Sequence, residues 1–278
     1  MNTRTYLFIL LALSMDASQA AGRVESRKAW TETYPVDTRT PTLEISNVWG
    51  DVRVRAGQAG EIVVSLEEFR SAPDQQRFER SMAVYELHTE ATANGVALYV
   101  GNPDGNWHGS DPCRGCRVEY RFDVLVPAST RLDLSTVNDG DIDVAGVSGT
   151  ISAANVNGPI AIAELHNCAV LNSVNGAVRL SFNAAPVENC EIETINGDVA
   201  LDLPDGSGMD LSVDLFNGRM LTQFAVDPLA IPPRVEHIES EGRHRYRIEQ
   251  AAGVRIGGGG PTFTISSLNG DIRVQKIN

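Results

Sequence analysis

Val156-Asn157-Gly158-Pro159-Ile160 is one copy of a short phrase that recurs along this chain of 278 residues. Further copies lie at 174–178, 195–199, 216–220 and 268–272, with looser versions at 136–142 and 47–52. The glycines at 140, 158, 176, 197 and 218 are separated by 18, 18, 21 and 21 residues. A phrase repeated at so regular a spacing predicts a series of similar structural units rather than one isolated hairpin.

The residues of the phrase indicate its place in each unit. Asn-Gly tolerates positive φ at consecutive positions, which is typical of tight turns. Short runs that alternate apolar and polar residues flank it and predict half-buried strands, as at Leu132–Leu134. Asparagines stacked from unit to unit can hydrogen-bond as amide ladders. We therefore expect turn and ladder roles for Asn157, Gly158, Asn175, Gly176, Asn196, Gly197, Asn217, Gly218, Asn269 and Gly270.

These units predict an all-β fold, a β-solenoid of 18–21-residue rungs with Asn-Gly corners. The alternative is an antiparallel meander or sandwich with Asn-Gly at every second turn. Two segments fit the solenoid poorly. The regular spacing of the repeats is interrupted at 219–261. One short helix is predicted at Pro73–Ala83, where Phe78 and Met82 lie four residues apart. Solenoid ends need covering, so both segments are expected to be excursions or caps.

The N-terminus has the parts of a secretory signal. Arg4 precedes the apolar run Tyr6–Leu13, and Ser18-Gln19-Ala20 offers small residues for cleavage before Ala21. No later run is long and apolar enough to span a membrane. We therefore expect an exported protein of the periplasm or cell surface, with no membrane span after signal removal.

The domain organisation follows from these assignments. Residues 1–20 are the signal peptide, 21–40 a lead-in, and 41–278 a single β-solenoid domain with excursions at 70–116 and 219–261. The lead-in is polar at its start and is expected to contain only a short edge strand at Trp30–Val36.

The formal net charge of −13 excludes some partners. Nucleic-acid binding needs basic surface to neutralise phosphates, so no nucleic acid is expected. The same sign argues against electrostatic docking on anionic lipid.

Four cysteines in an exported protein predict disulfides. Cys168 and Cys190 lie seven and six residues before Asn175 and Asn196, so stacking would bring their sulfurs within bonding range. Cys113 and Cys116 are favoured as a structural disulfide that tethers a loop.

Two alternatives for the Cys113/Cys116 pair stay open. A redox pair would ordinarily sit in a βαβ unit, whereas a strand is expected after Cys116. A zinc site could add His108 and Asp111, although zinc ligands usually come in two separated pairs.

The chain resembles a bacterial envelope family of unknown function, described as β-strand-repeat "putative adhesins". The matching pieces are Leu43–Val54, Val126–Asn138, the Asn-Gly copies after it, and Gly257–Val274, which together span nearly all of the chain after the signal. The resemblance implies a β-solenoid and an exported protein, and it supplies no catalytic residues. The chain departs from the family phrase at Asn138-Asp139-Gly140, which has one inserted residue, and at Gly158-Pro159.

Aspartates follow several of the turns, at Asp51, Asp141, Asp198 and Asp271. Carboxylates in rows serve calcium sites and glycan-cleaving enzymes. Pro159, Ala177 and Arg219 interrupt this row, so turn-exit residues are the favoured interpretation.

Other motifs are weaker. Gly257–Gly260 lacks the Lys-Ser or Lys-Thr of a phosphate loop. Trp49 and Trp107 could stack on sugars but are favoured as packing residues. No catalytic, cofactor-binding or metal-binding residues are predicted.

The functional hypothesis is an exported, non-enzymatic binding or scaffold module, adhesin-like, of the bacterial cell envelope. Its partner would be an unknown envelope protein or glycan. The alternative is a carbohydrate-active enzyme on a β-helix that uses a carboxylate pair. A third possibility is an accessory protein of envelope stress or signalling.

Overall fold

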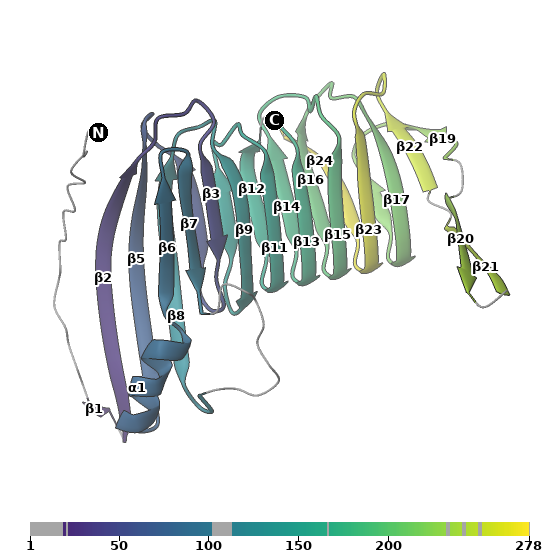
Figure 1. Cartoon of the computed structure of the whole chain (residues 1–278). Coiled ribbons are helices and arrows are strands. Elements are labelled where there is room, and N and C mark those ends of the chain that lie inside the picture. Colours follow the sequence, from purple (N-terminus) through teal and green to yellow (C-terminus); the bar gives the residue numbers. More distant parts are fainter. Residues whose placement is uncertain are drawn as a thin grey trace.

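The computed structural model describes residues 19–20, 22–101, 113–165, 167–231, 234–240, 243–249 and 252–277. Within them the protein is all-β with one helix, α1 (Gln75–Val84). The strands form two large sheets and a separate hairpin of β20 (Arg234–Ser240) and β21 (Arg243–Glu249) (Figure 1). The predicted signal peptide lies outside the described residues except for Gln19 and Ala20.

Each large sheet contains eleven strands. The first, sheet A, runs in the spatial order β1 (Gln19–Ala20), β2 (Arg23–Pro35), β5 (Glu61–Ala72), β8 (Arg117–Val126), β4 (Val52–Ala56), β10 (Ile142–Ala145), β12 (Ile160–Leu165), β14 (Val178–Phe182), β16 (Val199–Pro204), β24 (Ile272–Ile277) and β18 (Met220–Thr222).

The second, sheet B, runs β19 (Val226–Leu229), β22 (Ala252–Ile256), β17 (Met209–Asn217), β23 (Thr262–Asn269), β15 (Cys190–Asn196), β13 (Ala169–Asn175), β11 (Ile151–Asn157), β9 (Arg131–Asn138), β3 (Thr42–Ser46), β7 (Gly95–Val100) and β6 (Leu87–Thr92).

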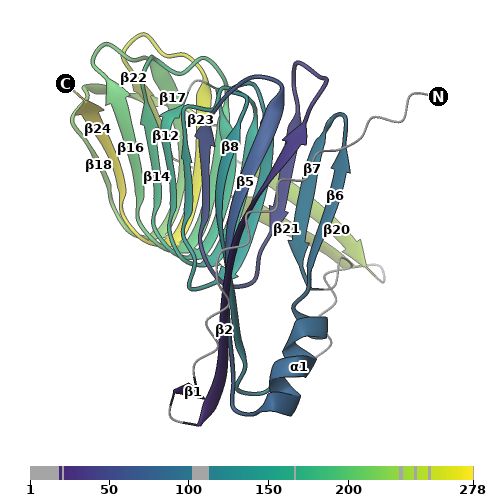
Figure 2. The same ribbon diagram turned by 90° about the vertical axis from the view of Figure 1, so that its left-hand side faces the viewer.

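The core lies between the two sheets, which face one another as layers (Figure 2). The strands alternate as half-buried strands do. In β11, Ile151 and Ala153 are buried while Ser152 and Ala154 are exposed, and in β12 Ile160 and Ile162 are buried. Burial of these aliphatic rows supplies the main force that holds the layers together.

The prediction of a β-solenoid is wrong. The strands form two open, mixed sheets packed face to face, a sandwich-like β fold without a closed coil. Antiparallel pairs build both ends of the molecule: β2, β5 and β8 with β6 and β7 at one end, and β17, β22 and β19 at the other. The two layers, rather than stacked closed rungs, bury the apolar faces.

The spatial order of the strands also departs from chain order. β23 pairs in parallel with β15 on one side and β17 on the other, and β24 likewise lies between β16 and β18. The last segment of the chain therefore returns and inserts between two strand pairs that are consecutive in sequence. A solenoid would instead have advanced steadily along its axis.

The extra residue of the 137–142 copy is absorbed locally. Asp139 adopts a left-handed backbone conformation with φ 47°. The parallel register on either side is kept, because Asn138 pairs with Asn157 and Ile142 with Ile160. Asparagine and aspartate are the non-glycine residues that tolerate this conformation best.

Helix α1 lies where one short helix is expected, at Gln75–Val84. It begins at Asp74, one residue after the predicted start at Pro73, and the Asp74 side chain accepts a hydrogen bond of 2.8 Å from the Arg77 N–H. Arg70 of β5 donates to the carbonyls of Ser81 and Tyr85 at the other end of the helix. The Ser81 carbonyl also accepts from the Tyr85 N–H and the Tyr85 carbonyl from the Tyr120 hydroxyl, so this buried guanidinium adds a further donor to each.

The lead-in is more ordered than expected. β2 pairs with β5 over all but its first residue, from Val24 opposite Ala72 to Pro35 opposite Glu61. The long strands β2, β5 and β8 extend beyond the sandwich and carry α1 against them (Figure 2). The two segments expected as excursions also contribute strands to the sheets: β6 and β7 come from 70–116, and β18, β19 and β22 from 219–261.

Candidate ligand-binding face

An asparagine column follows the ends of six strands of sheet B. Each side-chain amide Nδ2 except that of the first member, Asn138, donates to the Oδ1 of the preceding asparagine, at 2.8–3.3 Å. In spatial order the members are Asn138, Asn157, Asn175, Asn196, Asn269 and Asn217. Such a ladder fixes the register between strands and holds their ends at one level.

A glycine column lies beside the asparagines, at the connections from sheet B to sheet A. A Cβ on Gly176 would lie 2.0 Å from the carbonyl oxygen of Gly158, and one on Gly197 would lie 2.0 Å from that of Gly176. Gly158, Gly176, Gly197 and Gly218 do not have the left-handed φ expected of Asn-Gly turns. Glycine is required here because neighbouring backbones approach too closely for any side chain.

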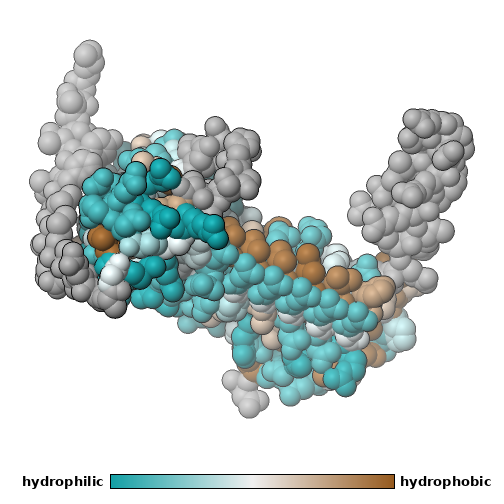
Figure 3. All heavy atoms as spheres, turned by 90° about the horizontal axis from the view of Figure 1, so that it is seen from below, coloured by the Kyte–Doolittle hydropathy of each residue, from teal (hydrophilic) through white to brown (hydrophobic). Residues whose placement is uncertain are grey.

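An apolar ridge precedes the asparagine column on the outer face of sheet B. It consists of the residue before each ladder asparagine: Val137, Val156, Val174, Ile195, Leu268 and Phe216. Exposure reaches 77% at Phe216, and Leu268 and Ile195 are also exposed. Figure 3 shows a continuous brown row crossing the strand ends between rows of hydrophilic residues. A contiguous exposed apolar strip of this kind marks an interaction site more often than isolated exposed residues do.

A groove of about 690 Å³ runs along this ridge. The ridge forms one wall, and a row two residues earlier on each strand forms the other: Ser135, Ala154, Asn172, Glu193, Ser266 and Asp214. Thr136, Asn155, Ser173, Thr194 and Ser267 contribute the floor between the walls. The groove therefore has one aliphatic wall and one polar, partly acidic wall.

Most exposed acidic residues of this face lack basic partners, whereas Asp210 is paired with Arg255 of β22. Asp133, Glu191, Glu193 and Asp214 are exposed on sheet B, and within the described part of the chain none forms an ion pair. On sheet A several aspartates have basic partners, whereas Asp123 and Glu164 have none among the described residues. Arg179 lies 2.8 Å from Asp202, and Arg273 contacts both Asp198 and Asp271. The face that carries the groove therefore presents four carboxylates that form no ion pair with a described residue.

The aspartates after the turns have structural partners. The carboxylates of Asp51, Asp198 and Asp271 accept hydrogen bonds from the backbone N–H groups of Asp141, Asp271 and Arg219 on the neighbouring strand connections. Hydrogen bonds from the Arg273 side chain, and then from the Asp271 backbone, lower the pKa of Asp198. Burial, then the nearby charges of Asp51 and Asp143, raises the pKa of Asp141. These contacts explain the aspartates after the turns as structural residues, and no bound ligand is needed to explain them.

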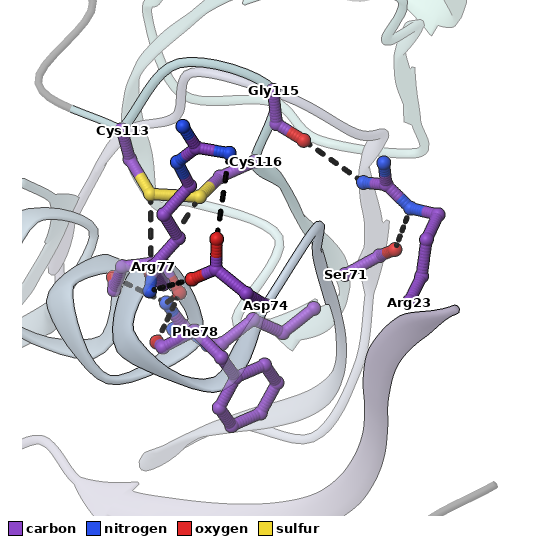
Figure 4. The surroundings of a disulfide bond; sticks show 10 residues. Arg23, Ser71, Asp74, Arg77, Phe78, Cys113, Gly115 and Cys116 are labelled. Atoms are coloured by element: carbon purple, nitrogen blue, oxygen red, sulfur yellow. Dashed lines mark hydrogen bonds and ion pairs between the residues drawn. A yellow bond between two sulfur atoms is a disulfide. The ribbon is translucent and has the colours of Figure 1, made fainter. Parts of the chain in front are cut away.

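The two cysteine pairs are both joined. Cys168 and Cys190 form a disulfide with Cα atoms 5.2 Å apart, and it links the beginnings of the neighbouring strands β13 and β15. Cys113 and Cys116 form the second, against the first turn of α1 (Figure 4). The Cys113 sulfur lies 3.1 Å from the Arg77 carbonyl oxygen, and Arg23 donates to the Gly115 carbonyl. This disulfide therefore ties the segment before β8 to the helix.

Several predicted residues lie elsewhere. Trp49 is partly buried and packs edge to face on Tyr85, with ring centroids 5.4 Å apart. Trp107, His108 and Asp111 lie outside the described residues, as does most of the 101–116 loop. Among the residues that the structure does describe, no cluster of three or more His, Cys, Asp or Glu side chains could hold a metal ion.

The sequence analysis did not identify the ridge, although its signal was present. Buried positions in β11 are 151, 153 and 155, so Val156 is out of phase with the core and must face outward. The same holds for the apolar residue before each Asn-Gly. An apolar residue that recurs at a solvent-facing position in each copy of the repeat is the pattern that indicates the ridge.

Comparisons with known proteins leave the family open. No family model matches the chain, and no characterised protein matches its sequence. A structure from Clostridium sporogenes named "putative cell adhesion protein" is similar at a TM-score of 0.46 and 10% identity, covering 90% of this chain and 100% of the other. A "putative lipid binding protein" from Parabacteroides distasonis gives a TM-score of 0.23 and 14% identity, covering 89% and 97%. Both TM-scores lie below 0.5, so neither likeness establishes the fold or the function of this chain.

No helix in the described parts of the chain is long and apolar enough to cross a membrane. The two disulfides are typical of proteins that fold in an oxidising compartment.

Proposed function

We propose that the protein is an exported, non-enzymatic binding module of the bacterial cell envelope, and that it binds through the outer face of sheet B. The observation that carries this proposal is the apolar ridge with its groove. A row of apolar side chains is kept across six strands, exposed at all but the half-buried Val174, although polar residues would serve a solvent-facing surface. Export is supported by the two disulfides.

The shape of the groove favours an elongated ligand. Neighbouring strands lie about 4.8 Å apart, so the groove from β9 to β17 is roughly 24 Å long. Its walls are two residues apart on each strand, about 6.7 Å from Cα to Cα. A long and narrow site suits a linear polymer better than a compact small molecule, which is usually enclosed in a deep pocket.

A carbohydrate-active enzyme is the second candidate, because two carboxylates do line the groove. Glu193 and Asp214 lie on either side of Ser266 in one row. Their Cα atoms are therefore about 9.6 Å apart, which allows the carboxyl groups to reach the roughly 6.5–9.5 Å separation of inverting glycosidases. Both side chains are exposed, however, and a general acid is ordinarily held in apolar surroundings that keep it protonated. The pair therefore supports binding more than catalysis.

The binding proposal is tested by charge placed on the ridge. The double variant Val156→Asp/Ile195→Asp is expected to lose retention on immobilised envelope fractions that hold the wild-type protein. Ala163→Asp on the outer face of sheet A is the matched control, since Ala163 is also an exposed strand residue. Equal retention of all three proteins would refute the binding face. Release of reducing sugar from cell-wall glycan by the wild type, abolished in Glu193→Gln, would establish the enzyme instead.

A further inference from the structure

The groove combines two chemical requirements on opposite walls. One wall is aliphatic from Val137 to Leu268 and ends at the exposed ring of Phe216. The other carries Glu193 and Asp214, with Asp133 and Glu191 further out on the same face. A ligand that satisfies both walls must present apolar groups and positive charge along its length. Lipids, glycans and polypeptides of a cell envelope differ in whether they meet this requirement.

The charge excludes several occupants. Anionic lipid surfaces and acidic glycans would be repelled by Asp133, Glu191, Glu193 and Asp214, which form no ion pair with a described residue. A second copy of this chain would place the same carboxylates against one another, and like charges in contact oppose docking. Neutral glycans can donate hydroxyl hydrogen bonds to the acidic wall, but they carry no positive charge to pair with its carboxylates. Polypeptide is the polymer that carries aliphatic side chains and fixed positive charges on one backbone.

We infer that the groove binds a basic, amphipathic polypeptide segment of another protein, in which Lys or Arg alternates with aliphatic residues. This inference rests on the proposed binding function and specifies its ligand. The aliphatic side chains lie on the ridge, and the basic side chains face Glu193 and Asp214. An extended chain advances about 3.4 Å per residue, so roughly seven residues span the groove.

The closing experiment uses a defined probe. The fluorescein-labelled peptide Lys-Val-Lys-Val-Lys-Val-Lys is titrated with the full-length protein and binding is followed by fluorescence anisotropy. Saturable binding is expected, weakening as salt rises because exposed charges are screened. Glu-Val-Glu-Val-Glu-Val-Glu and Lys-Ser-Lys-Ser-Lys-Ser-Lys are the peptide controls and are expected not to bind. Phosphatidylglycerol vesicles and soluble peptidoglycan fragments are the competing ligands.

Two variants locate the site. Glu193→Gln/Asp214→Asn and Val156→Ser/Ile195→Ser are each expected to weaken peptide binding about tenfold, which corresponds to about 1.4 kcal/mol. Asp143→Asn, which removes a carboxylate from sheet A, is the matched control and is expected to bind as the wild type does. Circular dichroism and thermal unfolding verify that every variant is folded.

The results distinguish the proposed ligand, a basic peptide, from the proposed binding role of the outer face of sheet B. Equal binding of the acidic peptide, or tight binding of the vesicles or glycan in its place, overturns the ligand class. If the ridge variants then still lose retention on envelope fractions, the binding face stands and only its ligand has been misassigned. If neither the peptide nor the envelope fractions distinguish the ridge variants from the wild type, both proposals fail.

Discussion

Gly176 leaves no room for a side chain. A Cβ there would meet the carbonyl oxygen of Gly158 at 2.0 Å, a distance that real Cβ atoms do not reach. Gly176→Ala is therefore expected to force the two strands apart and to lower the free energy of unfolding by about 3 kcal/mol, the upper end for overpacking. Urea denaturation followed by circular dichroism measures this loss.

The control for that substitution is Gly258→Ala. A Cβ on Gly258 would have no atom within 4 Å, and this glycine has no left-handed φ. Its stability is expected to stay within about 0.5 kcal/mol of the wild type, as for an ordinary surface substitution. Equal stability of the two variants would contradict the role assigned to the glycine column.

Asp141 and Asp198 are expected to affect stability with opposite signs. Burial and the charges of Asp51 and Asp143 raise the pKa of Asp141, so its ionisation opposes folding at neutral pH. Asp141→Asn should therefore stabilise the protein at pH 7, and the gain should vanish as the pH falls through the folded-state pKa toward the unfolded value of about 3.9. Thermal unfolding between pH 3 and pH 8 measures this dependence.

Asp198→Asn provides the opposing case. The Arg273 hydrogen bond lowers the pKa of Asp198, so its charge stabilises the folded state above the unfolded pKa. The variant should be less stable than the wild type at pH 7, and the difference should disappear as the pH falls below about 4. Parallel pH profiles of the two variants would rule out these assignments.

For single residues, the sequence indicated which positions matter in the repeat but not always why a given residue type is required there. Asn157 and Gly158 stand out by repetition alone. The sequence favoured positive φ, whereas the glycine is required by the approach of a neighbouring backbone. Such an approach involves residues 18 or more positions away and leaves no local signature.

The Cys168–Cys190 disulfide connects two neighbouring strands, β13 and β15, at the end opposite the asparagine column. It closes a loop for which chain entropy gives about 3 kcal/mol of stabilisation. Cys168→Ser/Cys190→Ser is expected to lower the melting temperature by about 6–12 °C, at 2–4 °C per kcal/mol for a chain of this size. Differential scanning calorimetry under non-reducing conditions gives the shift.

The Cys113→Ser/Cys116→Ser variant is the natural comparison. It opens a loop of only a few residues at the edge of the molecule, so its melting temperature should fall less. A larger loss in this variant than in the β13–β15 variant would contradict the chain-entropy explanation.

Individual strands were the most predictable elements. Alternation at Leu132–Leu134 and Ile142–Val144 marks β9 and β10, because one face of each strand is buried. The length of β2 was not predictable in the same way. Its polar residues are ordered by pairing of twelve residues with β5 rather than by burial of one apolar face, and that partner lies far along the chain.

The whole molecule depends on the final segment, β23 and β24. They separate β15 and β16 from β17 and β18 and pair with all four strands. Truncation after Pro261 is therefore expected to leave β17 and β18 without their parallel partners. Hydrogen exchange should show loss of protection at Met209–Asn217 and Met220–Thr222, well before the deleted residues in sequence.

A second truncation, after Gln275, is the control, because it keeps most of β24 paired with β16. Protection in β17 and β18 should persist in that protein. Retained protection after removal of residues 262–278 would show that β17 and β18 are held by contacts other than β23 and β24.

The topology could not have been predicted from the repeats. The Asn269-Gly270 copy is chemically equivalent to the others, so an asparagine ladder and an apolar core would accept it at any position in the stack. Its place in the chain predicted a position at the end of the ladder for Asn269. In the structure Asn269 lies between Asn196 and Asn217. Pairing order is a property of the whole chain, since each local pattern is satisfied by any similar neighbour.

The glycine column also determines which connections between strands can accept inserted residues. At that end Gly158 and Pro159 alone join β11 to β12, and Gly176 and Ala177 alone join β13 to β14. At the opposite end the connections vary, from the three residues before β13 to the longer segment 183–189 before β15. Foreign peptides grafted at 183–189 would be displayed without disturbing the register, whereas the same graft at Gly176 would interrupt the ladder. The protein thus has one variable rim, suited to carrying added segments, and one fixed rim that keeps the groove straight.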